Sequence, residues 1–444
     1  MVIVDTALQE RHKAGKPVRV GIIGAGFMAR GLVNQICNFV PGMRVAAIAN
    51  RNPEGGHEAY RYAGVTDARE VGSVSALEAC IAHEQPAYTG DAQLVCRAAG
   101  IDIVVEATGD VEYGAAAALA CIAHGKDMIL LNAELDATVG PILKKYADAA
   151  GVILSGCEGD QPGLEVNLWR YVRTIGLEPL VCGNIKGLQD PYRNPETQQG
   201  FAATWGQKPA MVASFADGTK ISFEQAVVAN ATGMTIARRG MNGWDFTRHR
   251  DELIHQFNMD FTGHVDDLTR VYDPEALRAM GGIVDYVVGL KPPPGVYVMA
   301  AMQDERQRHY LNYYKMGPGP LYSFYTPMHI CHFDFPISIA RVALFRDAVT
   351  APLDRPMVDV IAIAKKDLKA GERIDGFGGF CTYGECETYA VTQQEGLLPI
   401  GLAEGCVLRH DVAKDKAIAY ADIIVPEGRV SDRLRAEQTA RFPV

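Results

Sequence analysis

The first apolar residues of the chain follow a strand pattern and then a helix pattern. Residues 18–23 are almost continuously apolar, as in a buried strand, and they stop at a glycine turn, residues 24–26. A helix is predicted next, because apolar side chains recur about one helical turn apart at Met28, Leu32, Val33 and Ile36. Strand-like runs at 102–109, 127–132 and 151–157 each follow a helical segment. This alternation predicts an α/β fold with a Rossmann-type doubly wound parallel sheet over residues 1–157.

The glycine turn predicts a dinucleotide site. Gly24 permits a tight turn after the strand, Gly26 lets the backbone approach a pyrophosphate, and Ala29 supplies the third small position. The phosphates would lie at the N-terminus of the following helix, where backbone N–H groups and the helix dipole favour an anion. A second strand, residues 44–51, ends near the ~20-residue offset at which such folds read the ribose.

The end of the second strand favours NADPH as the cofactor. NAD sites place Asp or Glu there to bind the ribose 2'-hydroxyl, whereas this chain has Asn50, Arg51 and Asn52. A guanidinium at Arg51 suits a 2'-phosphate; the alternatives are NAD as the cofactor and Arg51 as a solvated loop residue. The cofactor-binding candidates are Gly24, Gly26, Phe27, Met28, Asn50, Arg51, Asn52, Thr108, Gly109, Asn132 and Glu134.

From residue 158 onward the pattern changes, and polar residues gather where predicted strands end. Lys186 follows an apolar strand and precedes a glycine, which suits a proton donor to a developing alkoxide. Glu158 and Asp160 stand one residue apart after a strand end, so they could share a divalent cation, Mg or Mn; a surface turn with a helix cap is the alternative. All three are candidate catalytic residues.

Basic residues between glycines are candidates for holding a substrate phosphate. They are Arg238, Arg239 and Lys315, and ordinary ion pairs are the alternative for each. We expect an α+β catalytic and oligomerisation domain over residues 158–350 and a small β-rich domain over 351–444. The stretch 53–100 exceeds a minimal crossover and is interpreted as an insertion without a function of its own.

Composition narrows the class of protein. The chain has 444 residues, 48% of them hydrophobic, which predicts two or three packed domains. A net charge of -10 argues against nucleic acid as a partner, and the longest apolar run, residues 115–123, is far below the ~18–20 residues of a membrane helix. With no signal-peptide pattern at the start, we expect a cytoplasmic protein.

The cysteines indicate a reducing environment. All ten lie outside CxxC pairs, and several have apolar neighbours, as buried thiols do. Two groups have spacings that only loosely fit a metal site, so core packing is the preferred interpretation for both. They are Cys381 with Cys386, and His329 with Cys331 and His332.

The motifs together resemble a known family. The chain is similar to the homoserine-dehydrogenase-like oxidoreductases with a C-terminal SAF domain in GAGFMARG, VEATG, LLNAE, SGCEGDQPG, NIKG and AKKDLKAGERIDGFGGF. Within that family it most resembles the 1-deoxy-D-xylulose 5-phosphate reductoisomerase-like enzymes, over essentially the whole chain. The resemblance implies an NADP-binding Rossmann domain, a catalytic domain with a homodimer contact, and an SAF-like domain. Lys186 matches the family's lysine-bearing segment, which implies a catalytic role.

The resemblance also implies a reaction. It is the NADPH-dependent and metal-dependent conversion of 1-deoxy-D-xylulose 5-phosphate to 2-C-methyl-D-erythritol 4-phosphate, a step of isoprenoid biosynthesis by the methylerythritol phosphate pathway. Homoserine dehydrogenases carry a lysine directly after the strand-end asparagine, but Ala133 and Glu134 follow Asn132 here, which argues against homoserine. Two alternatives stay open: an NAD(P)-dependent dehydrogenase of homoserine, a polyol or a sugar acid, and a non-catalytic nucleotide-sensing or carbohydrate-binding protein.

Overall fold

The computed structural model describes residues 4–444, which form two compact units. The first unit comprises residues 4–160, Ile330–Ala351 and Gly428–Arg441. The second comprises Gln161–His329, Pro352–Glu427 and Phe442–Val444. This division differs from the three consecutive domains expected from the sequence. Residues 330–351 and 428–441 belong to the first unit, and most of the expected C-terminal domain belongs to the second.

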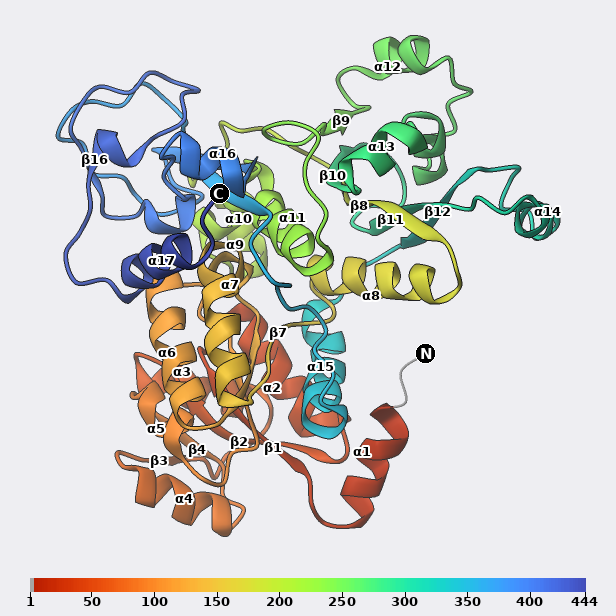
Figure 1. The fold of residues 1–444 in the computed structure, drawn as a ribbon. Coiled ribbons are helices and arrows are strands. Elements are labelled where there is room, and N and C mark those ends of the chain that lie inside the picture. The colour runs from red at the N-terminus through yellow and green to blue at the C-terminus, as the bar shows by residue number, and fades with distance from the viewer. Residues whose placement is uncertain (1–3) are drawn as a thin grey trace. The chain divides into compact units, whose positions relative to one another are not determined.

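A seven-stranded parallel sheet forms the centre of the first unit, which confirms the predicted α/β fold (Figure 1). Its strand order is β3-β4-β2-β1-β5-β6-β7. The strands are β1 (Val18–Ile23), β2 (Met43–Ala49), β3 (Arg69–Glu70), β4 (Ala87–Thr89), β5 (Ile103–Glu106), β6 (Asp127–Leu130) and β7 (Leu154–Gly156). The stretch 53–100 supplies β3 and β4, so it extends the sheet at one edge.

Helices cover both faces of this sheet. Val20 and Ile22 point into a core shared with α1, α2, α3 and α15, whereas Ile23 and Val104 point into a core shared with α4 to α7 and α17. The helices are α1 (Val4–Lys13), α2 (Phe27–Phe39), α3 (Pro53–Tyr62), α4 (Val74–Ala82), α5 (Ala92–Arg97), α6 (Val111–Ala123), α7 (Ala133–Ala150), α15 (Cys331–Phe345) and α17 (Val430–Arg441). Two helices from late in the chain therefore complete the first unit.

A five-stranded mixed sheet forms the centre of the second unit, in the order β12-β11-β8-β10-β9. Strand β8 is parallel to β10 and antiparallel to β11. The strands are β8 (Glu178–Lys186), β9 (Trp244–Asp245), β10 (Ile283–Val288), β11 (Val296–Ala301) and β12 (Leu321–Thr326). Helices α8 (Gln161–Thr174) and α11 (Thr219–Thr232) pack against this sheet.

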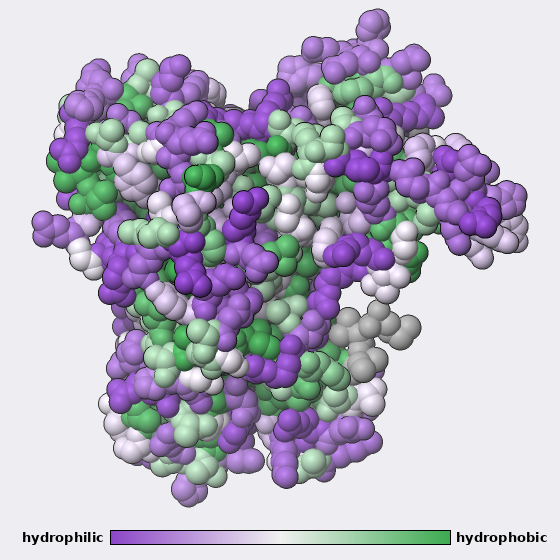
Figure 2. Space-filling model, viewed as in Figure 1, coloured by the Kyte–Doolittle hydropathy of each residue, from purple (hydrophilic) through white to green (hydrophobic). Residues whose placement is uncertain are grey.

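The remaining elements of the second unit are short. They are α9 (Gln199–Trp205), α10 (Pro209–Ala216), α12 (Arg250–Phe257), α13 (Pro274–Met280), α14 (Glu305–Tyr313), α16 (Tyr389–Gln394), η1 (Val265–Arg270), η2 (Ile400–Leu402) and η3 (Tyr420–Asp422). Two further sheets pair β13 (Val358–Ala364) with β14 (Thr382–Thr388), and β15 (Val407–Leu408) with β16 (Ile423–Ile424). Helix α14 has no buried residue, and the surface around it is hydrophilic (Figure 2).

The cysteines are free thiols, as expected from the sequence. None forms a disulfide, and nine of the ten are buried. The thiol of Cys386 donates to the Ser222 carbonyl at 3.2 Å, while that of Cys381 lies 3.8 Å from the Glu372 carboxylate. Burial raises the pKa of the Cys381 thiol to about 11. The two thiols thus have separate partners.

Candidate active site

The turn between β1 and α2 has the geometry of a phosphate cradle. Gly24 adopts φ +104°, and a Cβ there would lie 2.7 Å from the Ala107 carbonyl oxygen, so only glycine fits. A Cβ on Gly26 would meet nothing within 4 Å, which leaves open space at the N-terminus of α2. No side chain caps that helix, and its first turn, which begins with Phe27 and Met28, holds no acidic residue. The residues present therefore fit a bound pyrophosphate.

Of the three residues that follow β2, Asn50, Arg51 and Asn52, Arg51 carries an exposed positive charge. Asn52 caps α3 by accepting from the Glu54 amide, and the Asn50 amide donates to the Asn52 carbonyl at 2.7 Å. The Arg51 side chain is 81% exposed, and its guanidinium lies 3.9 Å from the Asp110 carboxylate. A pair at that distance and exposure is weak. Arg51 is therefore accessible to an anionic ligand.

The ends of β5 and β6 carry a buried carboxyl group that the sequence interpretation missed. Glu106 accepts from the amide and the hydroxyl of Thr108, and burial raises the pKa of Glu106 to about 7. Asn132 is fully buried; it caps α7 through Leu135 and donates to the Asp110 carbonyl at 3.2 Å. Glu134 is also buried, and Gly109 adopts φ +66°. The candidates Thr108, Gly109, Asn132 and Glu134 thus lie just after the ends of these two strands.

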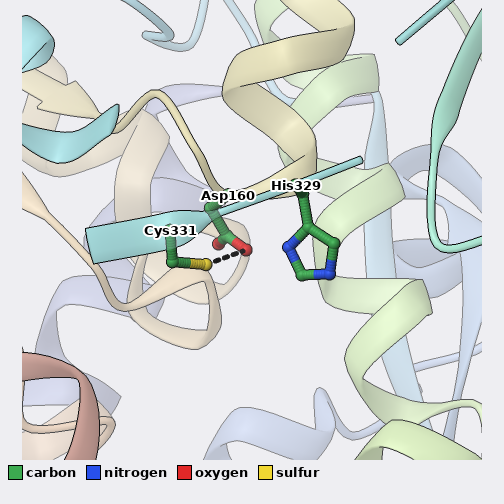
Figure 3. Close-up of side chains that lie close together, drawn as sticks. All are labelled: Asp160, His329 and Cys331. Atoms are coloured by element: carbon green, nitrogen blue, oxygen red, sulfur yellow. Dashed lines mark hydrogen bonds between the residues drawn. The ribbon is translucent and has the colours of Figure 1, made fainter. Parts of the chain in front are cut away.

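The acidic pair after β7 does not fit a shared divalent cation. The Glu158 carboxylate forms a buried ion pair with Arg341, at 2.8 Å, and Arg341 also binds Asp347. A guanidinium already neutralises Glu158, so it competes with a metal ion for that carboxylate. Asp160 instead lies beside the Cys331 thiol, whose sulfur is 3.9 Å from its Oδ1 (Figure 3). The expectation of a cation held by this pair is corrected accordingly.

Lys186 lies in a network of polar side chains within the second unit. Its Nζ lies 3.2 Å from Gln161 Oε1 and 3.5 Å from Glu224 Oε2. Asn184 accepts from the Gln161 amide at 2.5 Å and donates to Glu224 at 3.2 Å. Asn184 and Lys186 are alternate residues of β8 and so share one face of the sheet. We call Gln161, Asn184, Lys186 and Glu224 the Lys186 network.

Burial gives this network its chemical character. The side chains of Lys186 and Glu224 are 13% and 4% exposed. A cation held by a carboxylate and an amide in such surroundings can donate a hydrogen bond or a proton to a substrate oxygen. The sequence pattern pointed to Lys186 but not to Gln161 or Glu224, because these residues start α8 and lie inside α11, far from it in the chain.

The three basic phosphate candidates do not gather around one cavity. Arg238 lines a cavity of the second unit and donates to the carbonyls of Met241 and Asn242, each at 3.0 Å. Arg239 forms ion pairs with Glu387 and Glu395, at 2.6 and 2.7 Å. Lys315 is an exposed residue with φ +67° in the turn after α14. Arg239 and Lys315 are absent from the lining of that cavity.

Within the described part of the chain, every helix is too short or too polar to cross a membrane. Two family models match. Residues 24–154 match the homoserine dehydrogenase NAD-binding domain, and residues 159–335 match the catalytic domain of oxidoreductase DRL. Neither of these two models is that of an SAF domain. No curated protein matches the chain either.

Solved structures are similar to the chain at low identity. A probable dehydrogenase from Thermotoga maritima is 11% identical, covering 74% of this chain and 90% of that one, with a TM-score of 0.38. A myo-inositol dehydrogenase from Lactobacillus casei, in complex with NAD(H) and myo-inositol, is 17% identical over 41% and 50% of the chains, with a TM-score of 0.29.

An Agrobacterium radiobacter oxidoreductase in complex with NAD+, L-tartaric acid and magnesium is 18% identical over 46% and 55% of the chains, with a TM-score of 0.29. For several such structures, the chain covers about half of their length or less. The matched family models are thus those of an NAD-binding domain and of an oxidoreductase catalytic domain, and the glycine turn of residues 24–26 has a geometry that fits a dinucleotide.

Proposed function

We propose that the chain reduces the carbonyl group of a small polar substrate with NADPH, and that Lys186 is the residue that protonates the substrate oxygen. The observation that carries this proposal is the Lys186 network. The Lys186 ammonium group, at the end of β8, lies 3.5 Å from the buried carboxylate of Glu224 on α11, and both residues belong to the segment that matches an oxidoreductase catalytic domain.

The preference for NADPH rests on the end of β2. Arg51 is exposed and only weakly paired, and no carboxylate among residues 50–52 would repel a 2'-phosphate. Gly26 and the uncapped N-terminus of α2 would hold the pyrophosphate. When bound, NADPH supplies a hydride to the substrate carbon.

The chain's own residues then supply charge and a proton. Lys186 donates a hydrogen bond to the carbonyl oxygen and transfers its proton as negative charge develops there. Glu224 stabilises the ammonium form of Lys186, and Gln161 fixes the direction of the Nζ group. Because Glu224 acts through Lys186, it is a positioning residue.

The DRL domain match supports a phosphorylated hydroxyketone as the substrate, with 1-deoxy-D-xylulose 5-phosphate as the compound to test first. Its product would be 2-C-methyl-D-erythritol 4-phosphate, in isoprenoid biosynthesis. The skeletal rearrangement in that reaction rests on this match alone, since the Glu158 and Asp160 side chains do not fit a shared cation.

A second candidate is reversible oxidation of homoserine, a polyol or a sugar acid without rearrangement. Two observations favour it. Arg239 forms ion pairs with Glu387 and Glu395, and Arg341 forms an ion pair with Glu158. Such a reaction needs neither a phosphate clamp nor a metal ion, and the Lys186 network serves it equally well.

The test follows NADPH absorbance with the purified protein and 1-deoxy-D-xylulose 5-phosphate, with and without magnesium. NADH, and L-homoserine or polyols with NADP, are run in parallel. Oxidation of NADPH that depends on the sugar phosphate supports the first candidate, and turnover of an alcohol with NADP supports the second. Binding of NADPH with no turnover of any of these compounds contradicts both and favours a nucleotide-sensing protein.

A further inference from the structure

A cavity of about 460 Å³ lies within the second unit and has no part in the function proposed above. None of the four residues of the Lys186 network lines it. Its volume falls within the ~300–1,000 Å³ range of small-molecule sites in proteins. Its walls come from α11, α12, β10 and β14, together with the segment that leads into β9. The residues that line it include Gln189, Arg238, Trp244, Tyr286 and Glu385.

Four polar groups in these walls lack hydrogen-bond partners among the described residues. Gln189 Oε1 and Trp244 Nε1 are buried without a partner. The Tyr286 hydroxyl and the Glu385 carboxylate, both in partly buried side chains, make no hydrogen bond or ion pair within the described chain. Burial raises the pKa of both Tyr286 and Glu385. Buried polar groups are nearly always paired, so two unpaired buried atoms beside two unpaired, partly exposed groups on one cavity point to a missing ligand.

Two glycines leave space beside the Tyr286 hydroxyl and the Glu385 carboxylate. A Cβ on Gly243, which has φ +60°, would lie 2.4 Å from the Tyr286 hydroxyl oxygen. A Cβ on Gly240, which has φ +76°, would lie 3.4 Å from the Glu385 carboxyl carbon. Both glycines line the cavity, and any side chain there would crowd these polar groups.

Charged side chains of both signs surround the cavity. Asp217 is paired with Lys365 at 2.9 Å, and Asp245 accepts from Thr247. At the rim, exposed Arg248 lies 3.7 Å from the Asp245 carboxylate, and exposed His249 lies 3.4 Å from that of Glu252. The remaining charges are Arg238, anchored on two carbonyls, and Glu385. A phosphate would therefore face Glu385, and an amine would face Arg238, so a neutral ligand fits better than either.

The unpartnered groups include both kinds of hydrogen-bonding atom. Gln189 Oε1 and Glu385 accept, Trp244 Nε1 donates, and the Tyr286 hydroxyl does both. Hydroxyl groups also donate and accept, whereas an ammonium group only donates and a carboxylate only accepts. We propose that this cavity is a binding site for a neutral polyhydroxylated molecule of about monosaccharide size, separate from the Lys186 network.

The test measures binding of D-glucose, D-xylose and myo-inositol to the full-length protein by saturation-transfer difference NMR and calorimetry. We expect binding of at least one of them, weakened about tenfold or more (~1.4 kcal/mol) by Glu385→Gln and by Tyr286→Phe. Glu305→Gln, which changes an exposed carboxylate of α14 outside the cavity lining, is the matched control and keeps the affinity. Thermal melting establishes that each variant is folded.

Lys186→Ala separates this inference from the proposed function. It removes turnover but leaves polyol binding unchanged if the two sites are distinct. Loss of polyol binding in Lys186→Ala, or equal affinity in the wild type and Glu385→Gln, overturns the assignment. So does an absence of binding by all three polyols, or displacement of a bound polyol by inorganic phosphate or ethanolamine.

Discussion

The Lys186 ammonium group lies 3.5 Å from the Glu224 carboxylate, and both side chains are largely buried. Removal of one partner from such a pair leaves the other charge uncompensated in a poorly hydrated place. Asn184 binds the same carboxylate at 3.2 Å, so Glu224 is fixed by two neighbours. The charge and direction of Lys186 therefore depend on residues that do not themselves reach a substrate.

This dependence predicts that Glu224→Gln lowers kcat by about 10- to 100-fold while KM changes little. The amide keeps the shape and the contact with Asn184 but no longer stabilises the ammonium group. Steady-state kinetics check this, and a lowered kcat with an unchanged KM is the expected signature. Glu305→Gln, on exposed helix α14, is the control; an unaltered kcat in Glu224→Gln would show that Glu224 does not act through Lys186.

Arg51 predicts the cofactor preference. Arg51→Ala should raise KM for NADPH about tenfold or more and leave KM for NADH nearly unchanged, because only NADPH carries the 2'-phosphate. Arg61 on α3 is exposed and paired with Glu58, so Arg61→Ala serves as a nearby control. Equal effects of Arg51→Ala on the two cofactors would contradict a phosphate-binding role.

Gly26 and Gly24 predict opposite behaviour of two similar substitutions. Gly26→Ala should leave stability almost unchanged, because its Cβ meets no protein atom within 4 Å, yet it should weaken dinucleotide binding. Gly24→Ala should lower the free energy of unfolding, since it combines φ +104° with a contact of 2.7 Å to a carbonyl oxygen. Calorimetric titration with NADPH and urea unfolding measure the two properties. Full NADPH affinity in Gly26→Ala would place the phosphates elsewhere.

Glu106 predicts a pH dependence of stability. Its pKa is raised to about 7 in the folded protein by burial, so the folded state holds this proton more tightly than the unfolded state does. Stability from this group is therefore present below the unfolded pKa and is lost as pH rises through about 7. Glu106→Gln should remove this loss and gain ~1–3 kcal/mol at about pH 8, with little gain at about pH 5.

Urea unfolding at the two pH values measures the effect. Asp136, another buried carboxyl group whose pKa is raised by burial to about 7, contributes in the same direction and remains in the variant. The difference between wild type and Glu106→Gln isolates Glu106. A gain that is the same at both pH values would mean that the carboxyl group of Glu106 does not titrate as described.

The sequence predicts the first unit well because its signals are local. The strand, glycine turn and helix of residues 18–39 lie next to one another in the chain, and a parallel sheet follows from strands that alternate with helices. Helices α15 and α17 could not be assigned to this unit in the same way. Their apolar residues pack against α2 and against α6 and α7, which are hundreds of residues away.

The candidate site is only partly predictable for the same reason. Lys186 stands out beside a glycine at a strand end, but Glu224 becomes its neighbour only when α11 packs on β8. For Glu158 and Asp160, neighbours in the sequence were expected to act together. Because they stand one residue apart, a shared divalent cation was predicted. Their side chains instead meet Arg341 and Cys331, which lie on α15.

The most direct measurement compares Lys186→Ala with Lys13→Ala, an exposed lysine of α1, in NADPH binding and in carbonyl reduction of the substrate that the wild type turns over. If Lys186 donates the proton, Lys186→Ala binds NADPH normally and loses at least ~100-fold in kcat, while Lys13→Ala retains both properties. Full kcat in a correctly folded Lys186→Ala would contradict the role assigned to Lys186 and to the network around it.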